Sequence, residues 1–218
     1  MNNIIGIIVS VIYIGMILVS SKVFEKVGKE ASRKYIHIML SNWWIIAMIF
    51  FDNWIWASVM PLAFVFINYF SYKSNIIKVM ERDANDANKD SLGTVYYAIS
   101  LFVLSILTFG FLDDPSIGLC GIIVMGYGDG LAAVIGQAVK SKEFKINGNK
   151  KSLAGCLAMF LVTFMVIAGY LTYIEAGAVL LKSVVVAILM TIVEAVSIKG
   201  TDNISVPIIT SLLMIFLA

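Results

Sequence analysis

The sequence is dominated by apolar runs long enough to cross a lipid bilayer, and these runs recur from one end of the chain to the other. A membrane-spanning helix needs about 20 mostly apolar residues. Apolar residues occupy 60% of the 218 positions and charged residues 14%, whereas soluble domains carry roughly 25% charged residues. Backbone groups in lipid must hydrogen-bond among themselves, and the long runs favour helices over a barrel. The sequence therefore predicts an all-α integral membrane protein and excludes a soluble globular domain.

Eight of these apolar segments are predicted to cross the membrane as helices, within a single transmembrane domain covering residues 1–218. The eighth segment is short, so a bundle with seven full crossings is the alternative. The first segment has no basic lead-in and no small-residue cleavage site, so we expect a retained helix and not a signal peptide. The expected spans are 3–21, 36–51, 54–71, 92–112, 116–139, 153–173, 176–198 and 204–218.

Lysine and arginine are concentrated in every second loop of this arrangement. Such loops normally face the cytoplasm, so we expect a multi-pass plasma-membrane protein with both termini outside. The net charge of +2 gives no indication of a nucleic-acid partner. The basic residues of these loops are Lys22, Lys26, Lys29, Arg33, Lys34, Lys73, Lys78, Arg82, Lys89, Lys140, Lys142, Lys145, Lys150, Lys151 and Lys199, and the intervening loops contain Asp52, Asp113, Asp114 and Glu175.

One acidic residue, Asp129, lies deep within the fifth predicted span, in the string GYGDGLAAVIGQ. An isolated carboxylate at that depth is costly, so it should face a cation, a metal or a water-filled cavity. The neighbouring glycines are expected to let the helix break there, and non-helical backbone at this depth normally lines a cavity. The alternative is a packing helix whose aspartate pairs with a buried cation. Gly128, Ala132 and Gly136 also form a ridge of small residues that permits close approach by a helix or a ligand.

A basic cluster precedes the second span, in the string RKYIH. If residues 33–37 are helical, Arg33, Lys34 and His37 share one face of the helix. Two cations and a histidine at a cytoplasmic helix entrance suit phosphate recognition. The alternative is an anchor beside lipid headgroups.

A second basic segment, KSKEFKINGNKKSLAGC, follows the fifth span. It is predicted to be a flexible basic clamp that ends where the next helix begins. Ser152 is expected to cap that helix, whose exposed N–H groups would favour an anion. A solvated positive loop is the alternative.

Two further acidic residues, Glu194 and Asp202, lie at the cytoplasmic end of the seventh span. Glu194 falls inside an apolar segment and, like Asp129, needs a partner. A carboxylate pair formed by Asp129 with Asp202 or Glu194 could hold Mg²⁺, which takes oxygen ligands and phosphates. Two isolated cysteines and one histidine supply too few ligands for zinc or an iron–sulfur cluster. The acidic residues from Glu81 to Asp90 are predicted to solvate their loop.

Four strings occur in the order found in the CTP-dependent polyprenol kinases, and the chain resembles this family from about Glu30 to Leu213. The strings are RKYIH, SLGTVYYAISL, GDGLAAVIGQ followed by KKSLAG, and EAVSIKGTDNISVP. The family includes phytol, farnesol and dolichol kinases and is related to the membrane phosphatidate cytidylyltransferases. The resemblance implies transfer of the γ-phosphate of cytosolic CTP to an isoprenoid alcohol taken from the bilayer, with Mg²⁺ or Mn²⁺.

The resemblance also assigns roles to residues. Asp129, His37 and Asp202 are expected to act in catalysis, and Asp129, Glu194 and Asp202 to hold the metal. The chain departs from the family pattern at Ala154, where glutamate is usual, and at Lys140, where glycine is usual. The residues expected to bind the nucleotide are Arg33, Lys34, Gly128, Gly130, Ala132, Gly136, Lys150, Lys151, Ser152, Gly155 and Asn203.

Two other functions are alternatives to a kinase. A cytidylyltransferase acting on a phospholipid would also use CTP and a metal, but it would release pyrophosphate. An ion-coupled transporter could use Asp129 and Glu194 as a cation path, and it would be expected to contain inverted repeats with matching broken helices. A purely structural membrane subunit would not account for buried carboxylates. A homo-oligomer is compatible with each of these functions.

Overall fold

The chain forms a bundle of helices, and the computed structural model describes residues 2–74, 92–198 and 200–217. The predicted all-α membrane class is confirmed: six described helical segments are long and apolar enough to span a bilayer, and one more apolar helix has 16 residues. The helices are α1 (Asn3–Glu25), α2 (Lys29–Ser41), α3 (Trp43–Phe50), α4 (Trp54–Ser74), α5 (Gly93–Ile106), the π-helical η2 (Leu107–Phe111), α6 (Pro115–Ile123), the π-helical η3 (Val124–Asp129), α7 (Gly130–Ala138), α8 (Leu153–Tyr173), α9 (Val179–Val196) and α10 (Asp202–Leu217).

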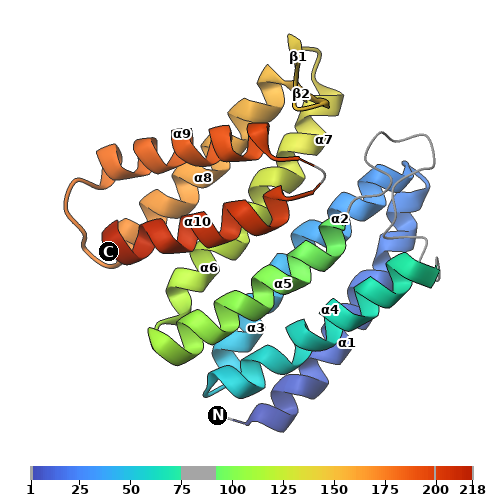
Figure 1. Cartoon of the computed structure of the whole chain (residues 1–218), viewed down its shortest axis with the longest axis vertical. Coiled ribbons are helices and arrows are strands. Elements are labelled where there is room, and N and C mark those ends of the chain that lie inside the picture. The colour runs from blue at the N-terminus through green and yellow to red at the C-terminus, as the bar shows by residue number, and fades with distance from the viewer. Residues whose placement is uncertain (1, 75–91, 199, 218) are drawn as a thin grey trace.

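The continuous segment α6–η3–α7 is the most buried of the six long spans. It packs against α2 and α3 on one side and against α8 and α10 on the other. Figure 1 shows α1, α4 and α5 gathered on the first side and α8 and α9 on the second. This central position explains why Asp129 of η3 is buried among protein side chains.

The second predicted span consists of two helices, α2 and α3, which meet at Asn42. The helix begins at Lys29, before the expected boundary at residue 36. Its first turns bury Ser32 and Lys34 in the bundle. An amphipathic turn of this kind is not detected by hydropathy, because its polar residues are stabilised by protein partners.

The fifth span does not break at its glycines, so that prediction is wrong. The backbone widens into the π-helical turn η3 and continues directly into α7. The glycines permit close packing: a methyl group on Gly126 would lie 2.3 Å from Cβ of Ser41, and one on Gly130 would lie 2.4 Å from Cγ1 of Ile38. α2 therefore approaches η3 closely enough for side chains of α2 to reach Asp129.

The predicted flexible clamp is instead an antiparallel hairpin of β1 (Glu143–Ile146) and β2 (Asn149–Ser152). Asn147 and Gly148 connect the strands with positive φ angles of 50° and 80°. Two consecutive residues with positive φ form a two-residue turn whose twist matches that of the flanking strands. The hairpin holds the basic residues of this segment in place above α7 and α8 (Figure 1).

The two chain ends lie away from the hairpin (Figure 1). Near the N-terminus, the Asn3 side chain donates a hydrogen bond of 2.9 Å to Asp52. Near the C-terminus, Lys182 Nζ donates a hydrogen bond of 2.6 Å to the Leu217 carbonyl. Each contact joins segments that the predicted topology places on the non-cytoplasmic side.

Candidate active site

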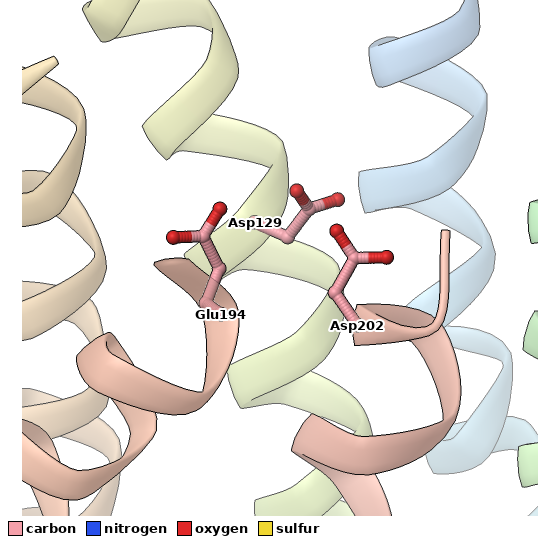
Figure 2. Close-up of side chains that lie close together, drawn as sticks. All are labelled: Asp129, Glu194 and Asp202. Atoms are coloured by element: carbon pink, nitrogen blue, oxygen red, sulfur yellow. The ribbon is translucent and has the colours of Figure 1, made fainter. Parts of the chain in front are cut away.

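Three carboxylates converge at the end of the bundle that carries the hairpin. Asp129 ends η3, Glu194 lies in the last turn of α9, and Asp202 begins α10. Each offers an oxygen, and these oxygens all lie within 4.8 Å of one another. Figure 2 shows the three side chains drawn together from separate helices. The residues themselves suggested a pair of carboxylates and the family resemblance implied all three, and the structure brings the three together.

Two residues of α2 contact the Asp129 carboxylate. Lys34 Nζ lies 2.6 Å from Oδ2 of Asp129, and His37 Nε2 lies 3.3 Å from the same oxygen. His37 Nε2 also lies 3.3 Å from the Met125 carbonyl. Because both neighbours of Nε2 are acceptors, this nitrogen carries the hydrogen and the lone pair lies on Nδ1. The expectation that Lys34 and His37 share a helix face is therefore met.

The other carboxylates have different partners. Lys151 forms an ion pair with Glu194. Burial lowers the pKa of the Lys151 ammonium, but the Glu194 carboxylate more than offsets this effect and the pKa is raised. Asp202 Oδ1 accepts a hydrogen bond of 3.0 Å from its neighbour's backbone N–H. Within the described ranges Asp202 has no ion pair, so three carboxylates face two lysines and one negative charge is left over.

Arg33 has a partner that the sequence analysis missed. Its Nε lies 2.9 Å from Oε2 of Glu30, one helical turn earlier. The i, i+3 spacing of opposite charges was visible in the sequence and is a common helix pairing. Arg33 is thus held in place on the wall of the cavity that the carboxylates line.

A polar cavity of about 1050 Å³ opens beside the carboxylates, between α2, α7, α9 and the hairpin. It lies at the upper end of the size range of small-molecule sites, roughly 300–1,000 Å³. Residues expected at the site that line it are Arg33, Lys34, Asp129, Ala132, Gly136, Lys150, Lys151, Ser152, Gly155, Glu194 and Asp202. Lining residues that the sequence analysis did not assign to the site include Lys29, Glu30, Gln137, Ser141, Glu143, Lys145 and Asn149.

Four expected site residues do not line this cavity, although one of them, His37, contacts Asp129. Gly128 packs against Met159, and Gly130 packs against Ile38 of α2. His37 and Asn203 line a second, smaller pocket that adjoins the cavity at Arg33. The predicted acidic loop from Glu81 to Asp90, and Lys199, lie outside the described residues.

The start of α8 is capped as predicted, with Ser152 Oγ accepting a hydrogen bond of 3.1 Å from the Gly155 N–H. However, Leu153 N–H donates to the Lys142 carbonyl, and Ala154 N–H donates to Ser141 Oγ. The N–H groups that we expected to be exposed to an anion are therefore satisfied by the hairpin connection. Positive charge at this end of the cavity comes from lysine side chains.

Comparison with known proteins identifies the family, although no family model and no solved structure matches the chain. The phytol kinase of Synechocystis sp. is 31% identical over an alignment of 216 residues, and the match covers 92% of this chain and 86% of the relative. The chain belongs to the phytol kinase family. Within this family, a probable chloroplastic phytol kinase of Triticum aestivum is 29% identical and is matched over 88% of this chain and 68% of its own. Phytol kinase 1 of Arabidopsis thaliana is 28% identical, and the match covers 85% of this chain and 66% of the Arabidopsis protein. Membership of the phytol kinase family confirms the resemblance drawn from the four sequence strings.

Proposed function

We propose that this protein is a membrane kinase that transfers the γ-phosphate of CTP to an isoprenoid alcohol of the phytol, farnesol or polyprenol type. The observation that carries the proposal is the cluster of Asp129, Glu194 and Asp202 on the wall of a polar cavity within a membrane bundle. The names of the relatives support an isoprenoid alcohol kinase. CTP as the donor follows from the resemblance to the polyprenol kinases.

The carboxylate cluster fits a divalent cation such as Mg²⁺ or Mn²⁺. Its donors are oxygens, which these ions prefer, and among the described residues only two lysines pair with its three carboxylates, which favours a cation. Asp129, Glu194 and Asp202 would hold the ion. When bound, such an ion neutralises charge on the β- and γ-phosphates.

The cavity's lysines suit the triphosphate of a nucleotide. Lys34 and Lys151 lie at the carboxylates, and Lys150 lies on the outer part of the hairpin, where it pairs with Glu143 at 2.7 Å. Ammonium groups that are already fixed in place stabilise transferring phosphate charge without reorganisation. We place the triphosphate along Lys34 and Lys151, with the rest of the nucleotide toward the hairpin.

The chemical step requires little covalent participation by the protein. The alcohol oxygen forms a bond to the γ-phosphorus while the bond from that phosphorus to the bridging oxygen breaks, and CDP leaves. The alcohol proton passes to Nδ1 of His37, which lines the small pocket, or to the Asp202 carboxylate, which lines the large cavity. Positioning and charge neutralisation provide most of the rate enhancement.

The membrane orientation follows from the same arrangement. We place the cavity at the cytoplasmic boundary of the plasma membrane and both termini outside, because the hairpin end carries most of the basic residues. CTP would then reach the site from the cytosol, and the alcohol would enter from the bilayer between helices.

Radiolabelled nucleotide tests the proposal. Purified protein in detergent with Mg²⁺ is incubated with phytol, farnesol or a polyprenol and with CTP, ATP, GTP or UTP labelled at the γ-phosphate. A kinase transfers the label to the lipid, with CTP as the best donor. Label released as pyrophosphate on addition of a phosphatidate would instead indicate a cytidylyltransferase. Absence of labelled lipid with every alcohol would refute the proposal.

A further inference from the structure

A small polar pocket lies behind the carboxylate cluster, between α2, α5 and α10. It has a volume of about 50 Å³, several times the space that one water molecule requires. Arg33 lines both this pocket and the large cavity. The residues lining the small pocket are Arg33, Ile36, His37, Leu40, Asn68, Gly93, Thr94, Tyr97 and Asn203. It therefore adjoins the site where the γ-phosphate is proposed to lie.

Asn203, which lines this pocket, has a buried polar atom without a hydrogen-bond partner in the described part of the chain. Asn203 is 7% exposed, and its Nδ2 donates a hydrogen bond of 3.1 Å to the Gly93 carbonyl. Its Oδ1 has no hydrogen-bond partner among the residues that the structure describes. Buried amide oxygens are normally hydrogen-bonded, so Asn203 presents an acceptor suited to a ligand with one hydroxyl group.

An apolar pocket of about 30 Å³ continues from the polar one. The two share Leu40, Asn68 and Tyr97. The apolar pocket lies mainly between α4 and α5, and its wall includes Phe64 and Ala98. The lining of the two connected pockets thus changes from polar, at Arg33 and Asn203, to apolar between α4 and α5. An alcohol with a long apolar tail has the same gradient.

We propose that these two pockets are the acceptor site for the isoprenoid alcohol, an inference that rests on the proposed kinase function. The alcohol O–H donates to Asn203 Oδ1, and the first isoprenoid carbons enter the apolar pocket between α4 and α5. The remainder of the tail lies along α4, most of which is not buried within the bundle. Asn203 is next to Asp202, and His37 contacts Asp129, so the hydroxyl is held beside the phosphate. Asn203 orients the hydroxyl, because an amide oxygen is too weak a base to keep the proton.

Kinetics of two variants test this assignment. Asn203→Leu should raise the KM for phytol at least tenfold and leave the KM for CTP within about twofold, because only the alcohol loses a partner. Ala98→Leu fills the apolar pocket and should lower kcat/KM for phytol at least tenfold, with much less effect on a five-carbon prenol. Ala187→Leu is the matched control: Ala187 is also fully buried but lies on α9, away from both pockets. Changes confined to the KM for CTP would overturn the assignment.

Photolabelling of the wild-type protein gives an answer that does not depend on the folding of any variant. A farnesol analogue with a diazirine near the hydroxyl should label peptides from α4 and α5, and excess phytol should suppress the labelling. Labelling that phytol does not suppress would overturn the acceptor site. If phytol protects these peptides but no alcohol is phosphorylated, the acceptor site stands and the proposed kinase function fails.

Discussion

Lys34 and Asp129 lie 95 positions apart in the chain, and the Lys34 ammonium lies 2.6 Å from the Asp129 carboxylate inside the bundle. The contact joins α2 to the π-helical turn η3 at the edge of the large cavity. It fixes one carboxylate of the cluster before any ligand arrives.

Replacement of Asp129 should abolish catalysis without unfolding the protein. Asp129→Asn keeps the shape of the side chain but removes a charge from the proposed metal and phosphate site, so we expect kcat to fall by about 100-fold or more. Initial rates with labelled CTP measure the loss, and gel filtration in detergent checks the fold. The control is Lys182→Gln at the opposite end of the bundle, which should retain full activity. A near-normal rate for Asp129→Asn, or a large loss for Lys182→Gln, would contradict the assignment of the site.

The Lys34–Asp129 pair should show strong coupling in stability. Lys34→Met leaves a buried carboxylate without its closest cation and should destabilise the protein by about 3–5 kcal/mol. Adding Asp129→Asn removes that charge, so the double variant should be more stable than Lys34→Met alone. Thermal unfolding of the two single variants and the double variant in detergent measures the coupling. Additive effects would show that the two charges do not interact.

The carboxylate cluster should bind Mn²⁺, a probe that can be followed by its paramagnetic resonance signal. Glu194→Gln and Asp202→Asn each remove one ligand and should weaken binding by at least about tenfold. Asp113→Asn, in the turn between η2 and α6, serves as the control and should bind Mn²⁺ like the wild type. Equal affinity for all four proteins would exclude the cluster as the metal site.

The Lys151–Glu194 pair predicts a pH dependence of stability at alkaline pH. The folded-state pKa of Lys151 is raised above its ordinary value of 10.5, so the pair contributes its full stabilisation below that value. The contribution is lost as the pH rises through the higher pKa of the folded state. The difference in melting temperature between wild type and Lys151→Gln should therefore be constant from neutral pH to about 10.5 and shrink above it. Lys142→Gln, at an exposed position on the hairpin connection, should show no such difference. A difference that already declines near neutral pH would contradict this account.

Gly121 marks a close contact between α6 and α10. A methyl group there would lie 2.3 Å from the Pro207 carbonyl oxygen, which is backbone and cannot rotate away. Gly121→Ala should therefore destabilise the protein by about 1–3 kcal/mol. Gly169 of α8 has nothing within 4 Å of the corresponding position, so Gly169→Ala should be neutral or slightly stabilising. Thermal unfolding of the two variants provides a matched comparison.

The sequence predicted the helical membrane class and the importance of Asp129, because apolar runs and a solitary acid within one of them are local signals. It also placed Lys34 and His37 on one helix face. The set of Asp129, Glu194 and Asp202 was expected only through the family resemblance, and no local pattern showed that the three carboxylates meet. Their convergence depends on how η3, α9 and α10 pack.

Two local features of the sequence indicate contacts that the surrounding charges conceal. The dipeptide Asn147–Gly148 indicates a two-residue hairpin, but the lysines around it favoured a flexible loop. Glu30 precedes Arg33 by one helical turn, yet the run of positive charge concealed the pairing. In contrast, the π-helical form of η3 has no evident sequence signal, since glycines permit a break, a close contact or a widened turn equally well.

The widened turn η3 has a consequence for how the central segment is oriented. A π-helical turn contains one residue more than an α-helical turn, so η3 rotates α7 relative to α6 by about 100° compared with an uninterrupted α-helix. Before the turn, Gly118 and Gly121 face Trp44 and Pro207; after it, Gly136 faces the start of α8. Deleting one residue from η3 would restore regular α-helical geometry. The deletion would rotate either Asp129 or the whole of α7 away from its present contacts. The extra residue of η3 therefore lets α6 pack through its glycines while the Asp129 carboxylate still points toward Glu194 and Asp202.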